Sequence, residues 1–203
     1  MSQIDGAQAR SELLSLVAAI AYERRRVVLR SGRVADYYMD CRRVTLHPRG
    51  STLCGRVFLD AFIASGLQVA AVGGPTMGAD PLVTAFQMTA HADGLDVPAF
   101  LVRKQAKDHG TASRIEGRFG VPAGARVLLL EDVLTTGGSL LEARDAVVEE
   151  GFDPVACMVL VDRGEGGREN MEAAGIRVIP VFSAAEVAAR REQIDQEFSN
   201  LSK

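Results

Sequence analysis

Apolar residues near the start of the chain recur at helical spacing, first over residues 7–22 and again over residues 51–64. This period predicts two helices. Between them, Val27–Leu29 and Asp36–Asp40 indicate short extended pieces on either side of a turn at Ser31–Gly32. This part does not share the rhythm of the rest of the chain, so we expect it to form a cap over the main body.

After residue 66, apolar runs of strand length alternate with helical patterns. The predicted strands are 67–72, 98–102, 126–131, 154–161 and 176–182, and the predicted helices are 79–90, 139–150 and about 167–174. The strand runs are continuously apolar, which is typical of strands covered by helices on both faces. The pattern therefore predicts an α/β fold with a central, mainly parallel sheet whose functional loops lie at the carboxyl ends of the strands.

The length of 203 residues suits a single domain. We expect an N-terminal hood with its helices at about 1–65, an α/β core at about 66–183, and a C-terminal helix or tail at 184–203. The net charge of −3 gives no sign of a nucleic-acid partner. No apolar run approaches the roughly 18 residues that would span a membrane. Three widely spaced cysteines and a polar N-terminus favour the cytoplasm.

The segment Val127–Ser139 carries the strongest chemical signal in the chain. An apolar strand ends in Glu131–Asp132, and the small residues Thr135–Ser139 then lead into a helix whose start resembles a capping box formed by Ser139 and Glu142. Small residues between a strand and a helix let backbone N–H groups converge on a phosphate. The acidic pair suits vicinal hydroxyls and Mg²⁺. The segment therefore predicts a cradle for a phosphorylated ribose.

A second signal lies just upstream, where residues 103–119 concentrate the basic side chains Arg103, Lys104, Lys107 and His109 ahead of two possible hinge glycines, Gly110 and Gly117. The connection between the flanking strands is about twenty residues long, and loops of that length are usually functional or disordered. A charged hairpin in solvent is the plain alternative. Beside a phosphate site, however, a basic loop could close over a diphosphate and stabilise the charge that develops on it.

Together these motifs resemble those of a known enzyme family. LLLEDVLTTGGSL resembles the phosphoribosyl-diphosphate (PRPP) motif of type I phosphoribosyltransferases, and RKQAKDHG resembles the catalytic loop of the orotate phosphoribosyltransferases within that group. The segment VVLRSGRVADYYMD also resembles an N-terminal element of these enzymes. The resemblance covers roughly residues 25–165 and implies the type I phosphoribosyltransferase fold with a small N-terminal hood.

The resemblance also implies roles for individual residues. Contacts with PRPP are implied for Arg103, Lys104, Lys107, His109, Glu131, Asp132, Val133, Leu134, Thr135, Thr136, Gly137, Gly138 and Ser139. Catalytic roles are implied for Lys104, Lys107, His109 and Asp132, and contacts with orotate for Arg30, Tyr37, Tyr38, Thr135 and Arg163. An arginine such as Arg163 can grip a planar carboxylate through two parallel hydrogen bonds.

One loop departs from the family pattern. Gly73–Pro81 stands where the family binds diphosphate, but Thr76–Met77 replaces the usual Tyr-Lys pair. We therefore expect the backbone of this loop, without a side-chain cation, to contact the diphosphate. The resemblance further implies Mg²⁺ held mainly through PRPP, with Glu131 and Asp132 nearby. It also implies a homodimer in which the 103–119 loop is shared between subunits.

The implied reaction joins orotate to the ribose of PRPP, giving orotidine 5′-monophosphate (OMP) and pyrophosphate in the synthesis of uridine 5′-monophosphate (UMP). Two alternatives stay open at this point. The chain could act on another base, although the carboxylate-binding arginine argues for orotate. It could also be a non-catalytic PRPP-binding regulator, although the sequence shows no added basic segment of the kind that would bind DNA.

Overall fold

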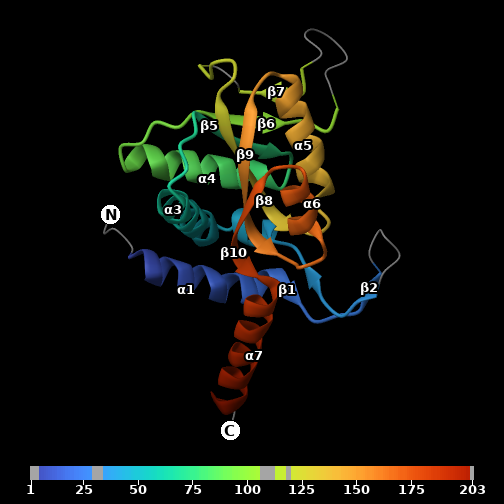
Figure 1. Cartoon of the computed structure of the whole chain (residues 1–203). Coiled ribbons are helices and arrows are strands. Elements are labelled where there is room, and N and C mark those ends of the chain that lie inside the picture. Colours follow the sequence, from blue (N-terminus) through green and yellow to red (C-terminus); the bar gives the residue numbers. More distant parts are fainter. Residues whose placement is uncertain (1–4, 29–33, 106–112, 118–119, 202–203) are drawn as a thin grey trace.

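The computed structural model describes residues 5–28, 34–105, 113–117 and 120–201. A six-stranded sheet forms its centre, in the order β10-β9-β8-β5-β6-β7 (Figure 1). The strands are β5 (Ala71–Pro75), β6 (Ala99–Val102), β7 (Ile115–Glu116), β8 (Arg126–Leu134), β9 (Asp153–Asp162) and β10 (Arg177–Ser183). All neighbours pair in parallel except β7, which is antiparallel to β6. The predicted α/β fold with a mainly parallel sheet is confirmed.

Helices cover both faces of the sheet, as the continuous apolar strands require. One face packs against α3 (Pro48–Ser65) and α4 (Ala79–Ala92), and the other against α5 (Gly138–Glu149) and α6 (Gly167–Ala173). Strand β8 shows the alternation directly, because Leu128 and Leu130 belong to the first core cluster, whereas Val127 and Leu129 belong to the second. All four side chains are fully buried.

The boundaries of two predicted strands differ from the structure. Strand β5 was expected at 67–72 but runs over Ala71–Pro75. The glycines Gly73 and Gly74 belong to it because the Phe100 ring and the Leu130 carbonyl approach so closely that a Cβ would overlap them. Strand β8 continues past the acidic pair to Leu134. Both strands therefore extend further toward the carboxyl edge of the sheet than their apolar runs indicate.

The hood, residues 22–45, lies over that edge. It holds two short antiparallel pairs: β1 (Tyr22–Glu23) with β4 (Tyr38–Met39), and β2 (Val27–Val28) with β3 (Val34–Ala35). The short helix α2 (Arg42–Thr45), which the apolar pattern did not predict, leads from the hood into α3. The expected turn at Ser31–Gly32 lies outside the described residues.

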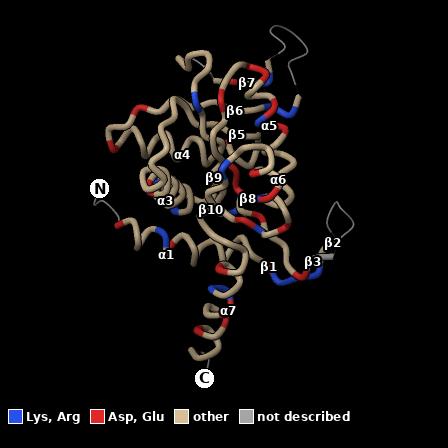
Figure 2. The backbone as a smooth tube through the Cα atoms, in the orientation of Figure 1, with Lys and Arg blue, Asp and Glu red and all other residues tan. Residues whose placement is uncertain are grey.

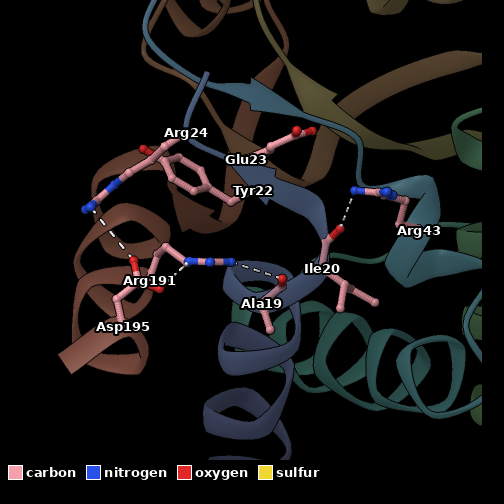
Figure 3. Close-up of a pocket in the computed structure, with 8 residues that line it drawn as sticks. All are labelled: Ala19, Ile20, Tyr22, Glu23, Arg24, Arg43, Arg191 and Asp195. Atoms are coloured by element: carbon pink, nitrogen blue, oxygen red, sulfur yellow. Dashed lines mark hydrogen bonds and ion pairs between the residues drawn. The ribbon is translucent and has the colours of Figure 1, made fainter. Parts of the chain in front are cut away.

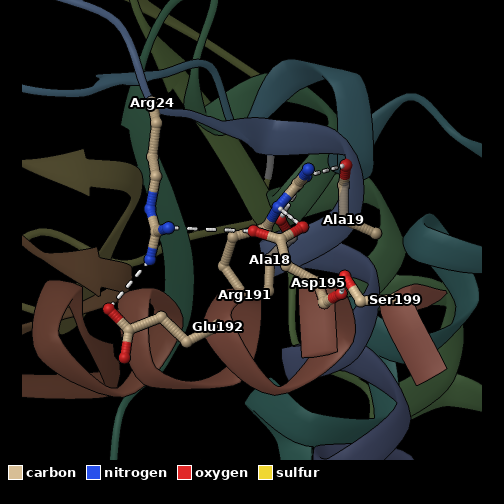
Figure 4. Close-up of polar contacts among 7 residues, drawn as sticks. All are labelled: Ala18, Ala19, Arg24, Arg191, Glu192, Asp195 and Ser199. Atoms are coloured by element: carbon tan, nitrogen blue, oxygen red, sulfur yellow. Dashed lines mark hydrogen bonds and ion pairs between the residues drawn. The ribbon is translucent and has the colours of Figure 1, made fainter. Parts of the chain in front are cut away.

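The first predicted helix, 7–22, divides into α1 (Gly6–Leu16) and a π-helical turn, η1 (Val17–Ala21). Arginines bind the carbonyls of that turn: Arg191 donates to Ala18 and Ala19, and Arg43 donates to Ile20 (Figures 3 and 4). Side chains from elsewhere in the fold thus satisfy the carbonyls at the end of the helix, which a local pattern does not reveal.

The C-terminal helix α7 (Ala184–Leu201) projects from the body and braces the root of the hood (Figure 1). Its Glu192 and Asp195 lie 2.8 and 3.8 Å from Arg24, just after β1 (Figure 4). A cavity of about 630 Å³ lies between η1, the hood and α7 (Figure 3). The arginines that line it are occupied by backbone carbonyls and carboxylates, so it offers no free cation among the described residues.

Charged residues of both signs are spread over the rest of the surface, while the central strands are mostly uncharged (Figure 2). The three cysteines, Cys41, Cys54 and Cys157, are buried and free. Among the described helices, none has both the length and the apolar character needed to cross a membrane.

Candidate functional site

A cleft of about 330 Å³ opens at the carboxyl ends of β5, β6, β8 and β9, beneath the hood. Its lining comes from five separate parts of the chain. The lining residues are Met39, Asp40, Cys41, Arg42, Thr76, Met77, Gly78, Lys104, Glu131, Asp132, Val133, Thr135, Ser139 and Arg163. The cleft therefore brings together the acidic pair, part of the glycine turn, one basic-loop lysine and the arginine after β9.

The acidic pair ends the buried part of β8. Glu131 is 7% exposed, and its Oε1 accepts a hydrogen bond of 3.2 Å from the backbone N–H of Asp132. Burial raises the pKa of Glu131 well above its ordinary value, and repulsion from Asp132 raises it further. Burial also raises the pKa of Asp132. Two carboxylates are thus held together with too little solvent to stabilise both charges.

The neighbouring loop fits closely around this pair. A Cβ at Gly78 would overlap Oε1 of Glu131 and Oδ1 of Asp132, so glycine is required where the backbone passes the two carboxylates. The pair can be stabilised by vicinal hydroxyls, which donate hydrogen bonds to carboxylates, or by a divalent cation. Among the described residues, no group of three acidic, histidine or cysteine side chains is arranged to hold a metal ion.

The turn after β8 differs in one respect from the predicted capping box. Helix α5 begins at Gly138, its N-cap is Gly137, and no side chain caps it. The left-handed Gly137, with φ of 83°, starts the helix, so Ser139 lies inside the first turn and lines the cleft instead of capping. The first N–H groups of an α-helix have no partner within the helix, which leaves them to bind an anion at this end.

Helix α6 fixes this turn from the side away from the cleft. Asn170 donates a hydrogen bond of 2.9 Å to the carbonyl of Thr136. Gly167 lies so close to the carbonyl of Thr135 that a Cβ there would overlap it. The backbone of the turn is therefore held in place before any ligand arrives, which lowers the entropic cost of binding.

The loop after β5 contributes backbone and apolar groups to the cleft. Thr76 and Met77 are joined by a cis peptide bond, and Met77 is 69% exposed. The loop Gly73–Pro81 contains no lysine or arginine, and contact between its backbone and a diphosphate stays a prediction. Arg42 lines the cleft together with this loop, and Asp40 holds it through hydrogen bonds of 2.8 and 3.0 Å.

Sequence reasoning missed Asp40 and Arg42. Their signal was the charged sequence D-C-R-R, which begins one residue after the aromatic pair and of which only Asp40 was interpreted, as the end of an extended piece. Arg42 also lowers the pKa of Asp132, although burial outweighs this effect. The paired side chains of Asp40 and Arg42 thus line the same cleft as the acidic pair, on the hood side.

The basic loop is described only at its two ends. Arg103 is half-buried at the start, where its guanidinium lies 3.4 Å from Glu116 of β7 and its backbone N–H bonds Arg114. Lys104 is exposed and lines the cleft. The short strand β7 was not predicted inside this stretch. Lys107 and His109 lie outside the described residues, and their roles stay predictions.

The base end of the cleft is formed around Arg163. Its side chain is 6% exposed, and its guanidinium lies 4.7 Å above the ring of Tyr37. Tyr37 in turn stacks on Tyr22 with ring centroids 5.0 Å apart. Tyr38 points to a different neighbour, because Arg25 lies 4.6 Å above its ring. Of the two predicted tyrosines, Tyr37 is thus the one that contacts Arg163. Arg30 lies outside the described residues.

Two nitrogens of Arg163 make no hydrogen bond within the described part of the chain. Nε and Nη2 are buried and make no hydrogen bond to any described residue, although Nη2 lies 2.7 Å from a carboxylate oxygen of Glu165. These nitrogens form the side-on edge of the guanidinium, which can bind both oxygens of a carboxylate. A buried, unsatisfied edge of this kind is costly unless a ligand completes it.

Comparison with known proteins identifies the architecture. The family model described as Phosphoribosyl transferase domain matches residues 74–182. An orotate phosphoribosyltransferase of Rhodopirellula baltica is 41% identical over 170 residues, which cover 82% of this chain and 87% of that protein. The orotate phosphoribosyltransferase of Mycobacterium tuberculosis H37Rv is 44% identical over 88% of this chain and 96% of its own. The chain belongs to the orotate phosphoribosyltransferase family.

Solved structures of the family agree with the fold. The Mycobacterium tuberculosis H37Rv orotate phosphoribosyltransferase in complex with PRPP has a TM-score of 0.71 and 41% identity, over 88% of this chain and 98% of that one. The same enzyme with Fe(III) dicitrate has a TM-score of 0.76. The type I phosphoribosyltransferase fold that the motifs implied is therefore confirmed for this family member.

Gly78→Ala tests how closely the loop fits the acidic pair. The added methyl group must push Glu131 and Asp132 apart or shift the loop, so we expect PRPP affinity to fall by about tenfold or more while the fold is kept. Titration calorimetry with PRPP and Mg²⁺ measures the affinity, and thermal unfolding checks the fold. Unchanged affinity would mean that the contact between the loop and the acidic pair does not matter for binding.

Glu131→Gln tests the raised pKa. The folded state favours the protonated acid, so the ionisation of Glu131 destabilises the protein as pH rises through its folded-state pKa, and the effect is absent below its ordinary pKa. The amide removes this cost, so we expect the variant to gain on the order of 1 kcal/mol in unfolding free energy at about pH 8. The gain should shrink toward about pH 4. Urea unfolding across this range measures it, and a gain independent of pH would contradict the assignment.

Proposed function

We propose that this chain transfers the 5-phosphoribosyl group of PRPP to orotate, releasing pyrophosphate and forming OMP, as a step in the synthesis of UMP. The observation that carries the proposal is the buried Arg163, whose Nε and Nη2 make no hydrogen bond to a described residue, in the same cleft as the acidic pair. One end of the cleft suits a sugar phosphate and the other a planar carboxylate. A molecule that carries a carboxylate and reacts at a sugar satisfies both.

We assign the half of the cleft that contains the acidic pair to the donor substrate, PRPP, because its residues have the chemistry to bind a sugar phosphate. Glu131 and Asp132 would accept hydrogen bonds from the ribose hydroxyls, and Thr135–Ser139 with the start of α5 would hold the 5′-phosphate. Mg²⁺ would lie between PRPP and the acidic pair and would neutralise part of the diphosphate charge. The two buried carboxylates support this fit, because added positive charge or donated hydrogen bonds relieve their repulsion.

In the reaction, the bond from N1 of orotate to the anomeric carbon forms as the bond to the diphosphate breaks. Such displacements pass through an oxocarbenium-like state, so positioning and charge stabilisation matter more than a protein nucleophile. We assign leaving-group stabilisation to Lys104, Lys107 and His109, with Lys107 as the most important. Lys104 lines the cleft at the start of the loop and supports this assignment.

The acceptor half would hold orotate beside the stacked pair of Tyr37 and Arg163. The Nε–Nη2 edge of the guanidinium matches the two oxygens of the orotate carboxylate, and Thr135, which also lines the cleft, would contact the base. We retain Arg30 and Tyr38 as further base-site residues on the strength of the family resemblance. The homodimer and the sharing of the 103–119 loop between subunits rest on the same ground. The free, buried cysteines support a cytoplasmic location.

A panel of bases tests the proposal. Protein with PRPP and Mg²⁺ is mixed in turn with orotate, uracil, adenine, hypoxanthine and xanthine, and turnover is followed by absorbance. We expect turnover of orotate. Turnover of a purine without orotate would establish a different phosphoribosyltransferase. The absence of any turnover, combined with PRPP binding, would favour a regulator that senses PRPP.

Arg163→Ala separates recognition of the carboxylate from the rest of the site. We expect the KM for orotate to rise by about a hundredfold, because a charge-assisted double hydrogen bond is lost, and the KM for PRPP to change little. Steady-state kinetics in both substrates measure the split. An equal rise in both KM values would place Arg163 outside the base site.

Lys107→Ala tests the leaving-group role of the basic loop. A contact that strengthens in the transition state should cost kcat more than it costs ground-state binding. We expect kcat to fall by about a hundredfold, with a much smaller change in the Kd for PRPP. Single-turnover kinetics and calorimetry provide the two quantities. Weaker binding with unchanged kcat would contradict a catalytic role.

A further inference from the structure

The turn between β9 and α6 brings a carboxylate to the base end of the cleft. Oε1 of Glu165 lies 2.7 Å from Nη2 of Arg163, and the two side chains are 13% and 6% exposed. An unpaired guanidinium buried this deeply would be costly, so Glu165 supplies the opposite charge that makes an empty site tolerable.

The geometry of this contact is that of a charge pair without a directed hydrogen bond. Nη2 lies within ion-pair distance of Glu165, yet neither Nη2 nor Nε makes a hydrogen bond within the described residues. A residue that oriented Arg163 would hold it through such bonds. The ring of Tyr37, 4.7 Å from the guanidinium carbon, lies against its face instead.

Glycines flank Glu165 on both sides. It stands between Gly164 and Gly166, which have φ of 67° and 90°, and both glycines have open space around them. The ends of the turn are fixed, because Gly164 donates to Asp162 at 2.9 Å and Gly167 packs against the phosphate turn. Glu165 therefore lies in a short turn, flanked by glycines, whose two ends are held by contacts.

From these observations we propose that Glu165 is an internal competitor of the substrate carboxylate. Its carboxylate neutralises the charge of Arg163 while the base site is empty. The carboxylate of a base or nucleotide displaces it when that ligand binds. The proposal rests on the proposed function, because it takes Arg163 as the carboxylate-binding residue. Glu165 thus tunes the affinity for orotate and OMP downward, which favours release of a charged product.

The test compares two nucleotides that differ only in the carboxylate, OMP and UMP. Glu165→Gln keeps the shape of the side chain and removes its charge, so it removes the competition. We expect the Kd for OMP to fall by about threefold to tenfold and the Kd for UMP to stay within about twofold. Titration calorimetry on the full-length protein measures both values.

Glu169→Gln is the matched control. Glu169 is exposed in the first turn of α6, so its loss changes the net charge equally, four residues away, and should leave both Kd values unchanged. Three outcomes would overturn the proposal: weaker or unchanged OMP binding in Glu165→Gln, equal tightening of OMP and UMP, or the same tightening in the control.

The orotate turnover assay separates this proposal from the proposed function. If Glu165→Gln fails to tighten OMP binding while the wild-type protein turns over orotate, then Glu165 does not compete and the function stands. If orotate is not turned over and the wild-type protein binds OMP no more tightly than UMP, the assignment of Arg163 is wrong and the proposal falls with it.

Discussion

The burial of two adjacent carboxylates at the end of a central strand is the constraint on which the rest of the site depends. Strand β8 carries Glu131 and Asp132 to the carboxyl edge of the sheet, where their charges repel each other and solvent is scarce. The folded protein keeps the pair despite this cost in free energy, and the cleft is formed around it. At Gly78 the backbone passes so close to both carboxylates that a Cβ would force their oxygens or the loop to shift.

The halves of the cleft come from distant parts of the chain. The core supplies the acidic pair and the phosphate turn, which α6 holds rigid through Asn170. The hood supplies Tyr37 and Arg42, and α7 braces the root of the hood through contacts with Arg24 and the carbonyls of η1 (Figures 3 and 4). Arg163 joins the two parts, since it extends from the end of β9 to the hood tyrosine. The C-terminal helix thus supports the base site although it lies far from the chemistry.

Local patterns were sufficient for the sheet, the flanking helices and the sugar-phosphate motif, because period, strand length and glycine turns are local properties. These patterns failed where contacts between residues far apart in the sequence determine the local structure. Strand β5 runs through two glycines because Phe100 and Leu130 leave no room for side chains. Helix α5 begins at a left-handed glycine and not at a capping serine. Arg42 and Glu165 enter the site only because the hood and the β9–α6 turn fold back over the cleft.

Burial and mutual repulsion favour a proton on the acidic pair of the free protein, whereas a ligand that brings hydroxyl donors or a cation favours the ionised pair. The most direct measurement is the number of protons released when PRPP and Mg²⁺ bind, from calorimetry at about pH 6 in buffers of different ionisation enthalpy. We expect the wild-type protein to release more protons than Glu131→Gln under the same conditions. The comparison with this variant corrects for protons that PRPP itself releases. Equal release from the two proteins would contradict this expectation.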